Sequence, residues 1–317
     1  IIQNGRSFLH IKAVFFLAFI SCFYTPSSWA VEIYFAEPKD ISVQAKRISD
    51  TLLSTTEELV NKRIESISSK AASNMGGNST LIIAIGPDVL SEVLSGSGLA
   101  PVIGVFISKL SFESVLNTND TKRTREISAI YSDPSPFRQV ALTRALYGPG
   151  HTSVIIGSQF SQMYIDDFSQ AALSVGINLK VIDLANISST SDFIAETNTA
   201  SSILLLKDKS LFDKISLEKI LLSSYDFNHQ GVIGYSKGLV NSGAAATTYS
   251  SLSDIAMSIN DQNNKLEANE LLIKPSYTNT FQVALNKYIL RSLDVVNMSE
   301  KEIHSEVSDL ILKGGIE

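Results

Sequence analysis

Short, nearly continuous runs of apolar residues alternate with amphipathic stretches along this 317-residue chain. A strand with helices on both faces has such an unbroken apolar run, whereas a half-exposed strand alternates apolar and polar residues. Repeated strand–helix alternation indicates parallel sheets with right-handed crossovers. The sequence therefore predicts an α/β fold. The predicted strands are 31–36, 81–85, 102–107, 127–132, 153–156, 179–184, 203–206, 232–235, 244–249 and 281–285, with 64–67 as a further candidate.

Helices between these strands have recognisable faces and ends. Apolar residues recur at helical spacing over 41–52 and predict one buried face. Pro136 follows a serine and suits the first position of a helix. Gly176 follows an amphipathic stretch and suits the left-handed conformation that ends many helices. These signals place helices between successive strands.

Two blocks of the strand–helix pattern follow one another, from 31 to 132 and from 152 to 235, with a tight turn at 148–150 near the boundary. A chain of this length suits two domains. No long linker rich in Gly, Ser or Pro separates the blocks, so we expect short crossing strands between them. We predict two lobes, an N-terminal lobe of residues 31–132 and 248–270 and a C-terminal lobe of residues 133–247 and 271–317.

The first thirty residues have the layout of a secretory signal. Arg6 and Lys12 precede an apolar run at 13–22, which is about half the length that spans a bilayer. Small residues at 28 and at Ala30 then suit a signal peptidase. We predict cleavage after Ala30 and export to the periplasm. A lipid anchor on Cys22 is the alternative.

Charge and cysteine content exclude several classes of protein. The chain has 26 Lys and Arg against 32 Asp and Glu, and it has no basic block. A nucleic-acid partner is therefore not expected. The single cysteine, Cys22, lies in the predicted signal, so the predicted mature protein has no disulfide and depends on its core. After residue 30 no apolar run is long enough to span a membrane, which predicts a soluble mature protein.

Catalytic and metal-binding patterns do not occur in the predicted mature sequence. Its histidines, His151, His229 and His304, are far apart and lack the spacing of metal ligands. No Gly-x-Ser-x-Gly elbow, Walker loop or Gly-x-Gly-x-x-Gly fingerprint is found. We therefore predict a protein that is not an enzyme and that needs neither a cofactor nor a metal.

Several segments, taken in their order along the chain, resemble a known family. They are 81–86, 101–105, 127–134, 138–142, 221–225, 231–236, 239–244 and 280–286. Together they are similar to the uncharacterised ABC-type transport system substrate-binding family, and they extend over nearly all of the predicted mature chain. The resemblance implies a type I periplasmic binding protein architecture, in which three segments join two Rossmann-like lobes.

The resemblance also implies that a small-molecule ligand binds between the lobes and is passed to the membrane permease of an ABC importer. A periplasmic sensor or accessory subunit that signals to a membrane partner is the alternative function. The chain departs from the family at one turn, where Gly86-Pro87-Asp88-Val89 stands in place of a frequent Gly-Thr-Glu-Ala. Pro87 removes a backbone donor and Asp88 adds negative charge, so an anionic ligand group is less welcome there.

Candidate ligand-binding residues follow the predicted strands. In open parallel sheets, ligands gather beyond the carboxyl ends of the strands, where helix N-termini offer unpaired N–H groups. The sequence places nine candidates at such positions or at the crossing between the blocks: Phe35, Asp88, Ser108, Asp133, Ser158, Gln159, Asp208, Tyr235 and Ser236.

These candidates have expected roles and structural alternatives. Phe35 and Tyr235 would form an apolar wall, and Ser158 would hold a carboxylate or hydroxyl. Asp208, with Asp88 as a further candidate, would face a positive or donor group. This set favours a zwitterionic or neutral polar ligand such as an amino acid. The alternatives are a core residue for Phe35, a helix cap for Ser158, a turn former for Asp208 and a brace for Asp133. As a loop carboxylate, Asp208 is expected to be dispensable for folding.

Overall fold

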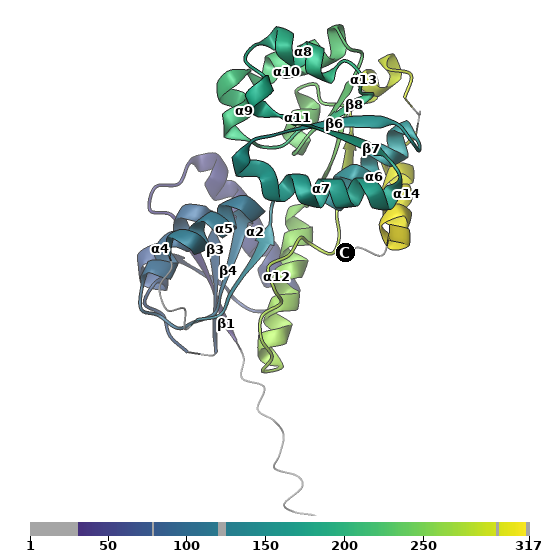
Figure 1. Ribbon diagram of the computed structural model, residues 1–317. Helices are drawn as coiled ribbons and strands as arrows, with labels where there is room; N and C mark the ends of the chain where they lie inside the picture. The colour runs from purple at the N-terminus through teal and green to yellow at the C-terminus, as the bar shows by residue number, and fades with distance from the viewer. Residues whose placement is uncertain (1–30, 78, 120–124, 296–297, 315–317) are drawn as a thin grey trace, which may run out of the picture.

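The structure, a computed structural model, describes residues 31–77, 79–119, 125–295 and 298–314, which fold into two α/β lobes (Figure 1). The predicted signal, with Ala30 and Cys22, lies outside the described residues. Within the described part of the chain, no helix combines the length and apolar character needed to cross a membrane. The predicted α/β class with two Rossmann-like lobes is confirmed.

The first lobe has a five-stranded parallel sheet in the order β2-β1-β3-β4-β5. Its strands are β1 (Glu32–Glu37), β2 (Glu65–Ser68), β3 (Thr80–Ile85), β4 (Val102–Ile107) and β5 (Ile127–Tyr131). Each predicted strand of this block is present, with ends within about two residues of the prediction. The helices are α2 (Val43–Val60), α3 (Ser69–Ala72), α4 (Pro87–Ser95) and α5 (Lys109–Thr118).

The second lobe has a six-stranded sheet in the order β11-β10-β9-β8-β6-β7. Its strands are β6 (Thr152–Gly157), β7 (Asn178–Asp183), β8 (Ser202–Leu204), β9 (Gly231–Ile233), β10 (Ala246–Tyr249) and β11 (Gln282–Leu285). The expectation of purely parallel sheets is wrong for β11, which runs antiparallel to β10 at the edge. An apolar run does not reveal direction, because direction depends on the route that the chain takes to the sheet.

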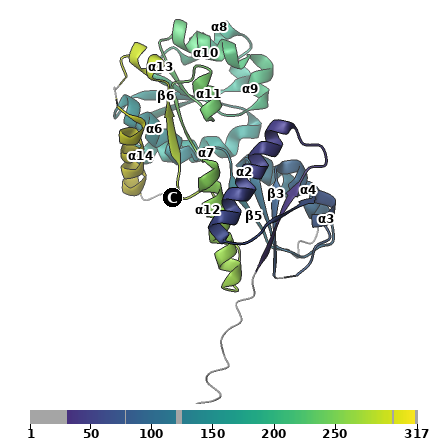
Figure 2. The ribbon, with the colours of Figure 1, turned by 180° about the vertical axis from the view of Figure 1, so that it is seen from behind.

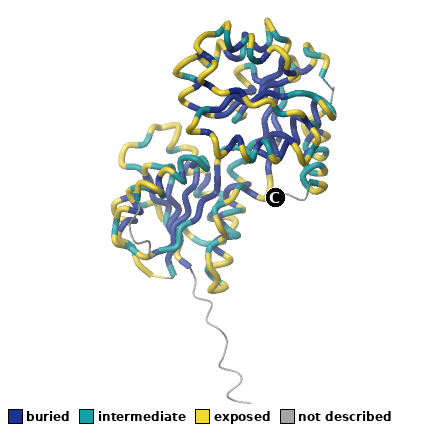
Figure 3. The backbone as a smooth tube through the Cα atoms, viewed as in Figure 1, coloured by how far each residue is buried: buried dark blue, intermediate teal, exposed yellow. Residues whose placement is uncertain are grey.

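Helices of the second lobe lie on both faces of its sheet. They are α6 (Pro136–Tyr147), α7 (Gln162–Val175), α8 (Thr190–Thr197), α9 (Lys209–Lys214), α10 (Leu217–Asp226), α11 (Lys237–Asn241), α13 (Lys287–Ser292) and α14 (Glu300–Gly314). Two short 3₁₀ helices, η1 (Gln159–Ser161) and η2 (Leu184–Asn186), begin after β6 and β7. The inner strands of both sheets are therefore buried between helical layers, as the dark blue strands in Figure 3 show, whereas the edge strands β2 and β7 are largely exposed.

A single helix from late in the chain, α12 (Leu252–Glu267), returns to the first lobe. It packs against α2, and Figure 2 shows the two helices side by side on one face of the first sheet. Ile255 and Ile259 of α12 are buried with Leu52 of α2 and Phe35 of β1. Burying such side chains contributes roughly 1.5–3 kcal/mol each, so α12 is an integral part of the first lobe.

The chain crosses between the lobes three times. It crosses after β5, again after β10, and a third time before β11. Ser276 still pairs with Ile130 of β5, and Ser128 Oγ donates a hydrogen bond to the Ile273 carbonyl at 2.5 Å. The third crossing therefore follows Ser276, a few residues beyond the predicted position at 271. With this adjustment we retain the lobe boundaries as a proposal.

Candidate functional site

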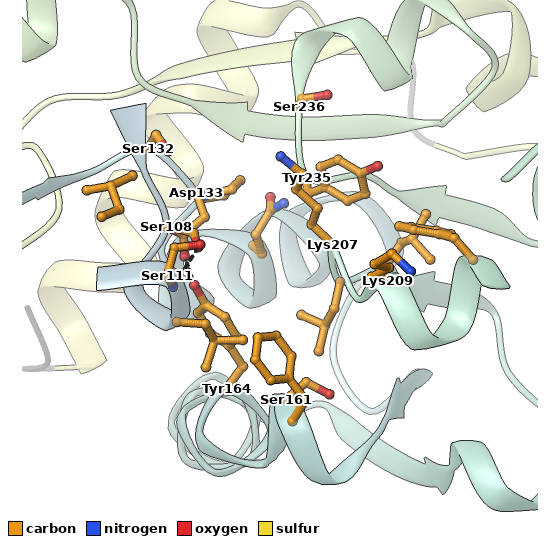
Figure 4. A pocket seen from close by; sticks show the side chains of 18 of the residues that line it. Ser108, Ser111, Ser132, Asp133, Ser161, Tyr164, Lys207, Lys209, Tyr235 and Ser236 are labelled. Carbon is orange, nitrogen blue, oxygen red and sulfur yellow. Dashed lines mark hydrogen bonds between the residues drawn. The ribbon is translucent and has the colours of Figure 1, made fainter. Parts of the chain in front are cut away.

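A cavity of about 590 Å³ lies between the two lobes (Figure 4). This volume falls within the range of small-molecule sites. Both lobes and the first crossing contribute to its lining: Pro87, Phe106, Ile107, Ser108, Leu110, Ser111, Ser132, Asp133, Pro134, Gln139, Phe160, Ser161, Tyr164, Phe168, Leu205, Leu206, Lys207, Lys209, Phe212, Tyr235 and Ser236.

The topology explains why the cavity lies there. Many of its lining residues lie at the carboxyl ends of β4, β5, β8 and β9 or follow directly after them. Parallel strands of one sheet all end at the same edge, so their following loops gather at one place. The two lobes present these edges to each other, and the cavity therefore has one wall from each lobe.

Phe106 enters the lining through an irregularity in β4. The pairing of β4 with β5 shifts register between Gly104 and Ile107, and Phe106 has φ of 54°. A bulky residue with positive φ is unusual and costs of order 1–3 kcal/mol. The bulge therefore places a strained aromatic residue at the cavity wall. Sequence reasoning missed Phe106, because a bulge within an unbroken apolar run leaves no local signal.

Asp133 connects the two lobes at the back of the cavity. Its Oδ1 accepts a hydrogen bond from the Lys109 backbone N–H at 2.9 Å, and its Oδ2 accepts one from the Tyr164 hydroxyl. Burial raises the pKa of Asp133, and these hydrogen bonds oppose the shift only in part. The Lys109 ammonium also pairs with Asp167 at 2.5 Å. The contacts of Asp133 are those of a brace between α5 and α7.

Asp208 is buried beneath the cavity wall instead of lining it. It is 2% exposed and caps α9 through the Ser210 N–H at 2.9 Å. Its Oδ2 accepts hydrogen bonds from Ser158 Oγ at 2.6 Å and Ser161 Oγ at 2.9 Å. Burial alone would raise the pKa of Asp208, but these hydrogen bonds outweigh it and hold the pKa below its usual value. The premise that Asp208 is a loop carboxylate at the rim of the cleft is therefore wrong, and we expect Asp208 to contribute to the stability of the fold.

Of the nine predicted residues, the structure brings four together around the cavity: Ser108, Asp133, Tyr235 and Ser236. The other five do not line it. Phe35 is fully buried in the core of the first lobe, because its side chain points to the face that α2 and α12 cover. Asp88 is exposed in the first turn of α4, and Gln159 is exposed in η1. Ser158 is half-buried and held by Asp208.

The second lobe supplies most of the apolar wall. Phe160, Phe168, Phe212 and Tyr235 all line the cavity, and the rings of Phe212 and Tyr235 lie 6.1 Å apart. Sequence reasoning identified only Tyr235 among these four. The others lie on α7, α9 and η1, where apolar residues at helical spacing indicate only a buried face. The arrangement suits a ligand with a sizeable apolar part.

No family model and no curated protein sequence matches the chain. Solved structures do match. A ligand-free, open substrate-binding protein with adhesive properties from Clostridium difficile is 13% identical, with a TM-score of 0.62 over 86% of this chain and 97% of the other. The ABC domain from Streptococcus pneumoniae in complex with L-Trp is 14% identical, with a TM-score of 0.54 over 87% of this chain and 98% of the other.

The fold is that of a type I periplasmic binding protein. A conserved domain protein from Vibrio cholerae has the same architecture, at 10% identity and a TM-score of 0.52 over 87% of this chain and 98% of the other. The resemblance inferred from the ordered segments is thereby confirmed at the level of the fold. At these identities the likeness extends to the architecture, and the ligand must be argued from the residues of this chain.

Proposed function

We propose that this type I periplasmic binding protein is an exported, non-enzymatic solute-binding protein that delivers a small molecule to the permease of an ABC importer. The observation that carries the proposal is the cavity between the lobes, which receives residues from both sheet edges. Two of the matching structures support it, because they are described as a substrate-binding protein and as an ABC domain with bound L-Trp.

In the proposed mechanism the lobes rotate about the three crossing segments and close on the ligand. Closure would cover the exposed part of the apolar wall, where Phe160 is 57% exposed. Removing that apolar surface from water favours the closed state only when a ligand fills the space between the lobes. A permease could then distinguish loaded from empty protein by shape.

The ligand is expected to carry an apolar body that fits against the aromatic side chains. The sequence alone favoured an amino acid, on the basis of Asp208 and Asp88. That basis is lost, because neither carboxylate lines the cavity. The apolar wall therefore predicts the body of the ligand, and the charged residues that do line the cavity determine its polar end.

A thermal-shift screen of the mature protein against small metabolites tests this function. A ligand at a hundredfold excess over its Kd stabilises the folded form by about 2.7 kcal/mol, which raises Tm by several degrees. The effect should be lost in Phe160→Ala and kept in Phe227→Ala. Phe227 is a matched control, since it is 68% exposed at the end of α10 and does not line the cavity. Equal responses of the two variants would place the site elsewhere.

A further inference from the structure

The charged residues around the cavity define the polar end of the ligand, provided that the proposed function holds. Among the described residues that line it, the cations are Lys207 and Lys209, and the only carboxylate is Asp133. Both lysines come from the second lobe, where they follow β8 and begin α9. The wall from the second lobe therefore carries a net positive charge.

Lys207 is the lysine that remains available to a ligand. Lys209 already pairs with Asp213 at 2.8 Å, one helical turn along α9. Lys207 has neither a hydrogen bond nor an ion pair within the described part of the chain. Its neighbour Asp208 offers no compensation, because that carboxylate is buried and accepts hydrogen bonds from three serines. When the lobes close, Lys207 needs an anion, since burying an unpaired charge is costly.

Asp133 is poorly suited to receive a ligand ammonium group. Each of its carboxylate oxygens already accepts a hydrogen bond, from Lys109 and from Tyr164. Its burial also favours the neutral acid, which attracts a cation less than a carboxylate does. No second carboxylate among the described lining residues takes its place. An ammonium group carried into this cavity would therefore lack an anionic partner.

The rest of the lining fits the apolar body of the ligand. Phe106 from the first lobe faces a wall from the second lobe that includes Phe160, Phe212 and Tyr235. Aromatic side chains on both sides of a cleft suit a ring or a branched chain. The hydroxyls of Ser108 and Ser236 also line the cavity, and each caps a helix, α5 and α11 respectively.

From this arrangement we propose that the ligand is an organic carboxylate with an aromatic or branched apolar body and no ammonium group. Lys207 binds the carboxylate through a charge-assisted hydrogen bond. The aromatic wall binds the body, and Asp133 keeps its role as a brace between α5 and α7. The site thereby selects carboxylic acids over the corresponding α-amino acids.

Matched pairs of compounds test the selection, because each pair differs only by the ammonium group. Isothermal titration of the mature protein would compare phenylpropionate with phenylalanine, and indolepropionate with tryptophan. The acids should bind at least about tenfold more tightly than the amino acids. This ratio corresponds to the cost of burying one unpaired charge. Lys207→Gln should weaken acid binding by about tenfold and Lys207→Arg should retain it. Lys219→Gln is the matched control and should change affinity little, because Lys219 is exposed on α10 and does not line the cavity.

The outcomes separate this inference from the proposed function. Tighter binding of the amino acids, or unchanged acid binding in Lys207→Gln, would overturn the inference and leave solute binding intact. The same holds if the metabolite screen finds only neutral or cationic ligands. If neither these pairs nor the screen yields a ligand, both the inference and the proposed function fail. A screen that yields only anions without an ammonium group supports the inference.

Discussion

Replacing Asp208 with Ala is expected to destabilise the second lobe. The variant loses the cap of α9, which contributes about 1 kcal/mol. It also leaves the buried hydroxyl of Ser161 and that of Ser158 without their acceptor, at about 1 kcal/mol each. The free energy of unfolding should therefore fall by about 3 kcal/mol, as measured by urea denaturation. Asp213→Ala is the matched control on the same helix, and its exposed ion pair should contribute less than about 1 kcal/mol.

The pH dependence of the free energy of unfolding tests the same role of Asp208. The pKa of Asp208 is lowered in the folded state, so its contribution to stability is present above the unfolded pKa of about 4. That contribution is lost as the pH falls through the lower folded pKa. Asp208→Asn should lack this part of the acid sensitivity. A stable Asp208→Ala variant with weakened ligand binding would refute the structural role and return Asp208 to the ligand site.

Two further predictions concern backbone strain and close packing. Phe106 has φ of 54°, so the Phe106→Gly variant should be more stable than Phe106→Ala by about 1 kcal/mol, the reverse of the order in regular structure. Equal unfolding midpoints for the two variants would count against a strained bulge. Gly231→Ala would place a Cβ 1.9 Å from the Tyr147 hydroxyl, so it should destabilise the protein by about 1–3 kcal/mol. Adding Tyr147→Phe should recover part of the Tm, and an unimproved double variant would exclude that clash as the cause.

The order and class of the strands were predictable from the sequence, because strands covered on both faces leave continuous apolar runs. β4 shows this well, since its apolar run coincides with the strand at both ends. The antiparallel direction of β11 was not predictable, because nothing in its four residues records how the chain approaches the sheet. The same limit applies to the short pairing of Ser276 with Ile130.

The candidate site was predictable in position but less so in its residues. The rule that ligands gather at the ends of parallel strands led to Ser108, Tyr235 and Ser236, and the expected crossing led to Asp133; all four line the cavity. The rule could not decide which of two adjacent side chains points into the cavity and which into the core. After β8 the carboxylate of Asp208 is buried and Lys207 lines the cavity, and this reverses the charge expected there. That choice depends on Ser158 and Ser161, which lie about fifty residues away in sequence.

The central claim is that the two lobes close on a small molecule held between them. The most direct measurement is the distance between spin labels on introduced cysteines, one at Val43 in α2 and one at Asp213 in α9, with and without a ligand from the screen. Val43 is 73% exposed and the Asp213 side chain 61% exposed, so both positions tolerate a label. We predict that ligand binding shortens the mean distance between the labels and narrows its distribution. An unchanged distance under saturating ligand would contradict the account.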